Sequence, residues 1–309
     1  MKTFTSEPLI DIFTSVQTAL KDSESVTFEI LNPDAKPGFY AGEILTIDGI
    51  AYVYRSYKAL HHFAELVFCR MLTPKIASEH TIFVTFVKLD TSDSFHHSEA
   101  KEEKYGTASP FNRIHKNEEP TFLNGYLRAL RSVKIKEKKR ILNLGINTGD
   151  EFDLIRHLLR PSEYHSLELV GIDHSPSAIQ TARERFNEGN ALFYVHDIND
   201  LDSLDLGQFD LIITIGTLQS TSVEFKPLFA SLVQKYLTPN GAMILGFPNC
   251  RWMDGEMIYG AKAPNYPYSE MSILIKDLYY CKKYLQQKKF RVTVTGSDYL
   301  FLTATKIGL

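Results

Sequence analysis

Residues 140–149 of this chain read Arg140-Ile141-Leu142-Asn143-Leu144-Gly145-Ile146-Asn147-Thr148-Gly149. The stretch is an apolar run that ends in a glycine-containing turn, and a helical pattern follows it over residues 150–159. A turn of this kind lets a small ligand lie against bare backbone at the end of a strand. The residues of the turn therefore bear on both the fold class and the kind of ligand.

Strand and helix patterns alternate from Arg140 to the end of the sequence. We expect strands at residues 141–144, 167–172, 191–195, 209–215, 242–247, 290–295 and 299–305, and helices at 150–159, 175–186, 223–237 and 269–287. This order predicts an α/β fold, with a Rossmann-like seven-stranded, mostly parallel sheet that helices cover on both faces. The reversal at Gly296-Ser297-Asp298 makes the last strand antiparallel.

Residues 1–89 form a first block with a different pattern. We predict a small α+β accessory domain, with helices at 7–21 and 59–72, strands at 26–31 and 81–89, and a hairpin of strands 43–47 and 50–54 around Asp48-Gly49. Residues 90–119 are polar and charged, which is typical of a linker. A helical pattern at 120–131 then opens the second domain, residues 120–309.

The composition is that of an ordinary globular protein: 309 residues, 44% hydrophobic and 23% charged, with a net charge of −3. This charge argues against a strongly basic nucleic-acid binder, although not against a local basic patch. No window approaches the roughly 18 apolar residues that span a bilayer, and residues 1–8 lack the apolar segment of a leader. Cys69, Cys250 and Cys281 give no disulfide framework, so we expect a cytoplasmic protein.

The turn after the first strand selects among cofactors. A dinucleotide fingerprint needs two further glycines, and this chain has Asn147 and Asp150 in their places. A carboxylate at the helix N-terminus competes with a pyrophosphate for the same backbone N–H groups, which argues against NAD and FAD. A P-loop is excluded because Gly-Lys-Ser/Thr is missing. S-adenosylmethionine has a nucleoside and a cationic centre but no phosphate, so it meets no such objection.

Acidic residues follow the next two strands. Asp173 ends the second strand, where a carboxylate can accept hydrogen bonds from both hydroxyls of a ribose. Asp197 ends the third strand, where a carboxylate can accept from the exocyclic amine of adenine while an apolar neighbour packs on the ring. Each aspartate could instead cap the turn that follows it.

Residues 140–306 resemble a class I S-adenosylmethionine-dependent methyltransferase. The matching pieces, in order, are Ile141-Leu142-Asn143-Leu144-Gly145-Ile146-Asn147-Thr148-Gly149, Gly171-Ile172-Asp173-His174-Ser175, Val195-His196-Asp197-Ile198, Phe209-Asp210-Leu211-Ile212-Ile213 and Leu237-Thr238-Pro239-Asn240-Gly241-Ala242. The resemblance implies S-adenosyl-L-methionine as the cofactor. It also implies a cofactor site made of Asn143, Gly145, Asn147, Gly149, Asp173, His174, Asp197, Ile198 and Gly216.

The sequence departs from the family pattern at two positions. An acid usually stands where Asn143 is, and a second glycine where Asn147 is. The amide of Asn143 can accept a hydrogen bond but lacks the charge that would attract the ammonium of the cofactor's methionine part. We therefore expect Asn143 either to lower cofactor affinity or to mark a partly degenerate site.

The acceptor is less defined. Residues 214–220 do not read Asp/Asn-Pro-Pro-Tyr/Phe, which counts against methylation of nucleobase amines. Residues 247–260, together with 264–268, form an insertion at the ligand-binding edge, and we interpret it as an acceptor wall rather than a packed loop. Tentative substrate-binding residues are Asn249, Arg251, Trp252, Glu256 and Tyr259. No catalytic base is assigned, with His174, His196, Glu256 and Tyr259 as nominees.

Three functional hypotheses follow. The first is a methyltransferase for a small molecule or an unidentified acceptor. The second is an RNA methyltransferase that grips nucleic acid through its first domain and through basic residues at 131–140, 282–283 and 288–289. The third is a non-catalytic binding protein with a cofactor fold. Two histidine pairs, His61-His62 and His96-His97, have no third ligand at metal spacing, so no metal site is predicted.

Overall fold

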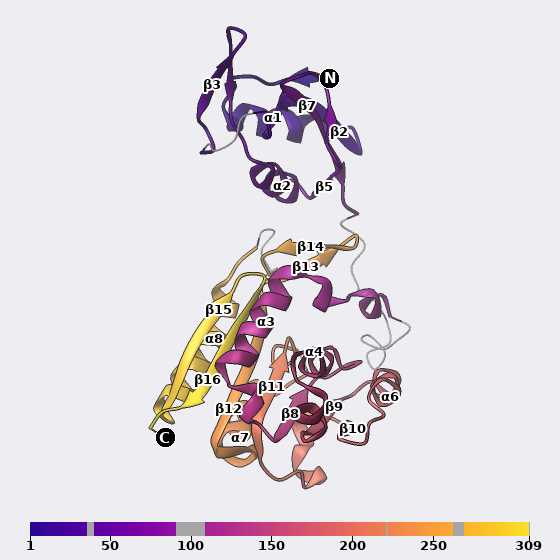
Figure 1. Ribbon diagram of the computed structural model, residues 1–309, viewed down its shortest axis with the longest axis vertical. Helices are drawn as coiled ribbons and strands as arrows, with labels where there is room; N and C mark the ends of the chain where they lie inside the picture. The colour runs from indigo at the N-terminus through magenta and orange to yellow at the C-terminus, as the bar shows by residue number, and fades with distance from the viewer. Residues whose placement is uncertain (36–39, 91–108, 221, 262–268, 309) are drawn as a thin grey trace. The chain divides into compact units, whose positions relative to one another are not determined.

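The computed structural model describes residues 1–35, 40–90, 109–220, 222–261 and 269–308. Figure 1 labels the elements. The chain divides into two compact units: Met1–Ser94 with Trp252–Ile258, and Phe95–Arg251 with Tyr259–Leu309. Each unit contains a β-sheet and a hydrophobic core.

The larger unit is built on a seven-stranded sheet in the order β10-β9-β8-β11-β12-β16-β15. Its strands are β8 (Arg140–Leu144), β9 (Glu168–Asp173), β10 (Ala191–Val195), β11 (Phe209–Ile215), β12 (Leu237–Pro248), β15 (Phe290–Gly296) and β16 (Tyr299–Lys306). The first five are mutually parallel, and β16 is antiparallel to both of its neighbours. The predicted Rossmann-like sheet with an antiparallel last strand is confirmed.

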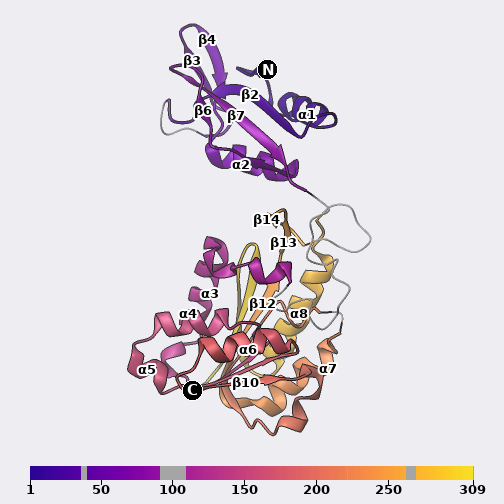
Figure 2. The ribbon, with the colours of Figure 1, turned by 90° about the vertical axis from the view of Figure 1, so that its right-hand side faces the viewer.

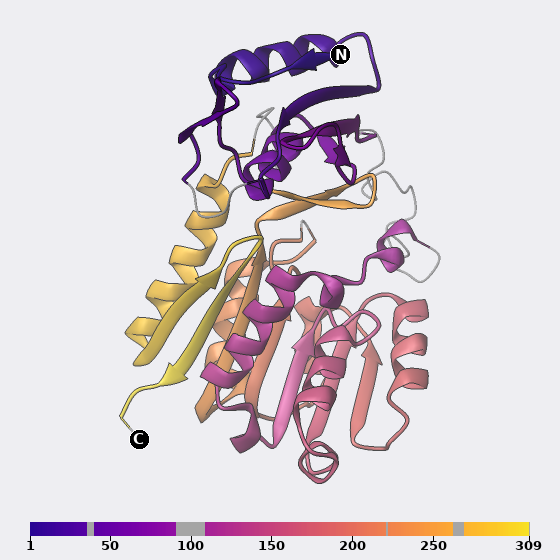
Figure 3. The same cartoon turned by 45° about the horizontal axis from the view of Figure 1, so that its top comes forward.

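Helices cover both faces of this sheet because its central strands are apolar on both sides. Along β8, Ile141 belongs to one core and Leu142 to the other, as strand alternation requires. Figure 3 looks onto the first face. That face packs against α3 (Pro120–Ser132), α4 (Asp150–Leu158), α5 (Pro161–His165) and α6 (Pro176–Arg185). The second face packs against α7 (Phe225–Ser231), the π-helical turn η6 (Leu232–Tyr236) and α8 (Ser272–Gln287).

Local sequence signals set the starts of the helices that border the carboxyl ends of the strands. Ser175 caps α6, because its hydroxyl accepts a hydrogen bond from the backbone N–H of Ala178 at 3.3 Å, and Pro176 occupies the first helical position. Helix α4 begins after Gly149, which has a φ of +95°. Helix α6 therefore begins three residues after the end of β9, and α4 begins directly after the glycine turn, as predicted.

The smaller unit has one face of a sheet covered by two helices (Figure 2). Strands β1 (Lys2–Thr3), β2 (Ser25–Leu31), β7 (Thr81–Lys88) and β5 (Cys69–Met71) lie in this order, with β6 (Lys75–Ile76) also paired to β7. Helices α1 (Leu9–Ala19) and α2 (Tyr57–Leu66) bury Val16 and Phe63 against Phe28 and Phe86. A separate hairpin of β3 (Ile44–Ile47) and β4 (Ile50–Val53) turns at Asp48-Gly49, as predicted.

The predicted helix at 59–72 is too long at its C-terminal end. Helix α2 ends at Leu66, and Phe68 has a left-handed φ of +53° that stops the helix. Cys69 to Met71 then pair with β7 as strand β5. Tertiary pairing along β7 thus outweighs the apolar helical pattern of these residues.

Two differences concern the second half of the chain. The predicted helix at 223–237 divides into α7 and η6, and β12 begins at Leu237, earlier than the predicted 242–247. The predicted insertion contains a hairpin of β13 (Cys250–Met253) and β14 (Glu256–Tyr259). Its turn residues, Asp254 and Gly255, have positive φ values of +48° and +78°, as the Asp-Gly pair of the first hairpin does.

Part of the predicted linker and of the insertion lies outside the described residues. These parts are 91–108, with His96-His97, and 262–268. Residues 109–119 contain two short 3-10 helices, η2 (Pro110–Arg113) and η3 (Lys116–Glu118). In the described part of the chain, no helix is long and apolar enough to cross a bilayer.

Replacing Gly149 with alanine is expected to destabilise the larger unit. A Cβ at this position would lie 2.3 Å from the ring of Phe186, in addition to the strain of a left-handed φ. Gly189 is the matched control, because it has a φ of +84° and open space around a Cβ. We expect Gly149→Ala to lower the free energy of unfolding by roughly 1–3 kcal/mol more than Gly189→Ala in denaturant titrations. Equal losses would contradict the predicted clash.

Candidate functional site

The junction between β8 and α4 is a turn with three left-handed residues. Gly145, Asn147 and Gly149 have φ values of +72°, +49° and +95°. The backbone N–H groups of Gly145 and Ile146 both donate to the carbonyl oxygen of Ile172, at N···O distances of 2.8 and 3.2 Å. These bonds tie the turn to strand β9. Glycine and asparagine are the residues that adopt this conformation most readily, so the turn accepts few other sequences.

Asn147 stands where the family pattern has a glycine, and its backbone adopts the left-handed conformation that glycine favours. Its left-handed conformation is one that asparagine tolerates because its short amide side chain can bond locally. Here Oδ1 of Asn147 accepts a hydrogen bond from the N–H of Thr148 at 2.9 Å. The departure from the family pattern at this position is therefore conservative in conformation.

Asp173 joins the end of β9 to the glycine turn. Its Oδ2 accepts the backbone N–H of Asn147 at 2.9 Å, and its Oδ1 accepts that of Ser175 at 3.0 Å. The residue is only 5% exposed. Since each carboxylate oxygen can accept two hydrogen bonds, both oxygens keep capacity for a ligand. His174 Nδ1 lies 3.3 Å from Oδ1 of Asp173.

Asp197 follows β10 and caps the next segment. Its Oδ1 accepts the backbone N–H of Asn199 at 2.9 Å, at the start of the 3-10 segment η5 (Ile198–Leu204). The side chain of Ile198 is buried in the second core rather than exposed beside Asp197. The sequence reasoning assigned these two residues to the adenine, and the structure gives each of them a local structural role as well.

Asn143 is fully buried in the middle of the sheet. It lies on β8 between Ile213 of β11 and Gly171 of β9. Neither Oδ1 nor Nδ2 has a hydrogen-bond partner among the described residues. A buried polar group without a partner costs free energy, so an unsatisfied amide at this position favours a role in ligand binding.

Thr217 covers Gly145, and the sequence reasoning did not single it out. A Cβ on Gly145 would lie 2.0 Å from Oγ1 of Thr217, so glycine is required beneath this side chain. The hydroxyl of Thr217 donates to the carbonyl oxygen of Leu144 at 3.1 Å. Gly216, just before it, has a φ of +74°. The loop after β11 thus lies directly over the glycine turn, as its position after a neighbouring strand predicts.

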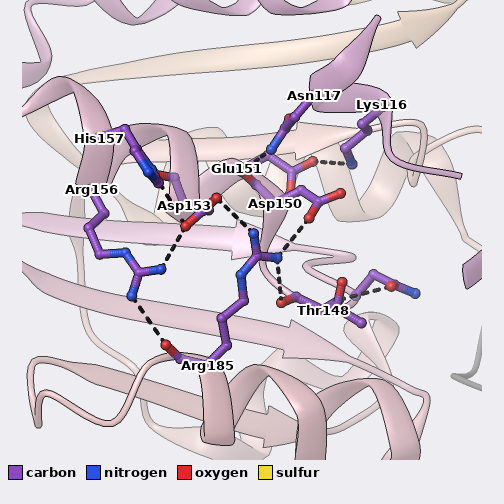
Figure 4. Close-up of polar contacts among 10 residues, drawn as sticks. Lys116, Asn117, Thr148, Asp150, Glu151, Asp153, Arg156, His157 and Arg185 are labelled. Atoms are coloured by element: carbon purple, nitrogen blue, oxygen red, sulfur yellow. Dashed lines mark hydrogen bonds and ion pairs between the residues drawn. The ribbon is translucent and has the colours of Figure 1, made fainter. Parts of the chain in front are cut away.

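Charged residues surround the first turn of α4 (Figure 4). The guanidinium of Arg185 pairs with Asp150 at 2.8 Å and with Asp153 at 2.7 Å, and Arg156 pairs with Asp153 at 2.7 Å. Lys116, from η3, lies 2.6 Å from Oε1 of Glu151. All three acids of this turn therefore have a cationic partner.

This network corrects one step of the sequence reasoning. The sequence predicts that the carboxylate of Asp150 competes with a pyrophosphate for backbone N–H groups, but this carboxylate pairs with Arg185 instead. Asn117 further binds the backbone of Asp150, donating from Nδ2 to its carbonyl oxygen at 3.1 Å. The argument against dinucleotides then depends on the sequence pattern, with Asn147 and Asp150 in place of glycines, more than on charge.

The tentative substrate residues do not form one cluster within a single unit. Asn249, Arg251 and Tyr259 belong to the larger unit, whereas Trp252 and Glu256 belong to the smaller one. Asn249 is 1% exposed and donates to the carbonyl oxygen of Ser297 at 3.1 Å, which is a structural contact.

Arg251, Glu256 and His196 also have local partners. Arg251 donates to the hydroxyl of Ser269 at 3.1 Å, and Arg70 donates to Oε1 of Glu256 at 2.5 Å within the smaller unit. His196 Nε2 lies 2.7 Å from the carbonyl oxygen of Asp200.

The basic stretch at 131–140 is partly neutralised. Arg140 pairs with Glu168 at 2.6 Å, and Lys134 pairs with Glu137 at 3.5 Å. This pairing favours a solvated face over a surface that follows phosphates, so the RNA hypothesis gains no support from the geometry.

Comparison with known families places this site in context. A family model described as "Methyltransferase domain" matches residues 135–290, which include the glycine turn, Asp173, Asp197 and Gly216. No curated protein matches the chain.

Solved structures of methyltransferases are similar in fold. One is a precorrin-6y C5,15-methyltransferase from Geobacter metallireducens, with 10% identity over 59% of this chain and 88% of that one, at a TM-score of 0.40. Another, described as TehB-like and S-adenosylmethionine-dependent, is from Corynebacterium glutamicum, with 19% identity, coverages of 59% and 87%, and a TM-score of 0.39. A third, from Aquifex aeolicus, has 15% identity, coverages of 63% and 98%, and a TM-score of 0.42. Likeness at this level concerns the fold alone. Through the match over residues 135–290, the chain belongs to the methyltransferase-domain family.

Proposed function

We propose that this methyltransferase uses S-adenosyl-L-methionine to methylate a small-molecule acceptor. The observation that carries the proposal is the pairing of the left-handed glycine turn with the Asp173 carboxylate, which binds that turn and retains capacity for two more hydrogen bonds. Membership of the family makes the chain an enzyme, so the non-catalytic alternative is not pursued.

The residues at the carboxyl ends of β8, β9 and β10 fit this cofactor. Asp173 would accept from the ribose hydroxyls, and Asp197 from the adenine amine. Gly145 and Gly149 give the turn its left-handed conformation, and the unpartnered amide of Asn143 provides a buried polar contact. The remaining proposed contacts come from Asn147, His174, Ile198 and Gly216.

The protein's contribution is mainly positioning. When bound, the cofactor supplies a methyl group on a positively charged sulfur, open to in-line displacement by a nucleophile. Holding two reactants in line is by itself worth several kcal/mol of barrier, about 7 or more in well-oriented cases. A base is needed only for a hydroxyl or a protonated amine, and we assign none.

The acceptor and the domain roles stay proposals. Asn249, Arg251, Trp252, Glu256 and Tyr259 remain the tentative substrate residues, to be tested one at a time. Residues 1–89 are proposed as an accessory domain, 90–119 as a linker and 120–309 as the methyltransferase domain. The three cysteines are free, in keeping with the proposed cytoplasmic location.

Isothermal titration calorimetry of the full chain with S-adenosyl-L-homocysteine tests the cofactor directly. We expect saturable one-to-one binding. NAD is the matched negative control because it shares the adenosine but adds a pyrophosphate. Absence of heat at about millimolar S-adenosyl-L-homocysteine would contradict the proposed function.

Asp173→Asn is expected to weaken S-adenosyl-L-homocysteine binding by about tenfold or more, because hydrogen bonds to the charged carboxylate are lost. It should also destabilise the turn, since the amide offers only one acceptor oxygen to two backbone N–H groups.

Asp210→Asn is the matched control for this substitution. One oxygen of Asp210, Oδ2, accepts two backbone N–H groups, those of Lys139 and Arg140, both at 3.1 Å, at the amino end of β8. The amide oxygen of an asparagine can keep both of these bonds. We expect Asp210→Asn to leave affinity unchanged and Asp173→Asn to lower it. Unchanged affinity in Asp173→Asn would disprove the ribose assignment.

A further inference from the structure

The ion pair between Lys116 and Glu151, at the start of α4, is largely buried. The side chain of Glu151 is 1% exposed and that of Lys116 is 16% exposed, with 2.6 Å between Nζ and Oε1 (Figure 4). Glu151 is the second residue of α4, directly after the glycine turn. Lys116 comes from η3, which lies before the part of the chain that the family model matches.

This pair has unused hydrogen-bonding capacity. Oε2 of Glu151 is buried and has no partner among the described residues. The ammonium of Lys116 has three N–H donors, and one of them is directed at Glu151. Leaving a buried carboxylate oxygen unsatisfied is costly, which indicates that another group binds there.

The surrounding charges keep Lys116 protonated. Burial lowers the pKa of its ammonium, but the carboxylates of Glu151, Asp150 and Asp173 together outweigh this effect and leave the pKa raised. Asp173 is also the residue proposed to hold the ribose.

Glu151 is a buried carboxylate eight residues after the buried, uncharged Asn143. Asn143 lies two residues after Ile141 on β8, so their side chains lie on the same face of the sheet. Ile141 packs in the same core as Phe152 of α4, so α4 covers that face. Glu151 thus supplies a negative charge from the helix that covers the Asn143 side of the sheet.

We propose that the Lys116–Glu151 ion pair binds the amino-acid end of the cofactor, with Glu151 accepting from the α-ammonium and Lys116 donating to the α-carboxylate. This inference rests on the proposed function. An ion pair and a zwitterion placed head to tail form four alternating charges with no net charge, so neither group is left buried without a counter-charge. Lys116 and Glu151 then determine specificity for a ligand that carries an amino-acid group.

The test compares two ligands that differ in this group alone. S-adenosyl-L-homocysteine has the amino-acid end, whereas 5′-methylthioadenosine keeps the nucleoside and sulfur without it. By calorimetry we expect the wild-type chain to bind the first more tightly. Glu151→Gln and Lys116→Gln should each weaken S-adenosyl-L-homocysteine by about tenfold or more and change 5′-methylthioadenosine by less than about twofold.

Glu168→Gln is the matched control, because it breaks the Arg140–Glu168 pair of the same 2.6 Å length at the amino end of the strands. It should leave both affinities unchanged. A decarboxylated analogue of S-adenosyl-L-homocysteine separates the two roles: we expect Lys116→Gln to affect its binding much less than Glu151→Gln does.

Several outcomes would overturn the proposal. One is equal affinity of the wild-type chain for S-adenosyl-L-homocysteine and 5′-methylthioadenosine. This comparison uses the wild-type chain alone, so it tests the proposal even if Glu151→Gln fails to fold. Another is an equal loss for both ligands in Glu151→Gln and Lys116→Gln, which would mean that the pair only stabilises the turn. If neither ligand binds the wild-type chain, the proposed function itself is wrong, and the inference is rejected with it.

Discussion

The hydrogen bonds of the Asp173 carboxylate hold together the two strand ends on which the site depends. One oxygen binds the backbone of Asn147 in the glycine turn, and the other binds Ser175 at the start of α6. A parallel sheet brings the carboxyl ends of β8 and β9 to one edge, but it does not fix the loops that follow. This buried carboxylate therefore helps to hold the turn, together with the backbone N–H groups of Gly145 and Ile146 that bind Ile172.

A second constraint is charge balance around the first turn of α4. Three of the first four residues of α4 are acidic, and the positive N-terminal end of the helix dipole stabilises them. Burying these carboxylates together nevertheless requires counter-charges. Arg185 and Arg156 supply positive charges for Asp150 and Asp153. Lys116, from a segment that precedes the sheet in the sequence, supplies the positive charge for Glu151. The site is thus assembled from parts of the chain that lie far apart in the sequence.

Local signals allowed much of the fold to be predicted. Ser175-Pro176 marked the start of α6, and Asp48-Gly49 marked the turn of the first hairpin. The same signal at Asp254-Gly255 was missed, because the segment was interpreted as a wall rather than a hairpin. The end of α2 could not be predicted, since strand β5 forms only through pairing with β7, and that pairing is not visible in the apolar pattern of residues 67–72.

The sequence by itself determined the alternation of strands and helices, the glycine turn and the acids at the strand ends, because these depend on periodicity and on which residues tolerate left-handed backbone. Only the tertiary structure decided that Asp173 binds the turn, that Thr217 covers Gly145 and that Lys116 neutralises Glu151. Each of these contacts joins residues at least 26 positions apart, and such pairings arise from how the sheet and helices pack rather than from any local pattern.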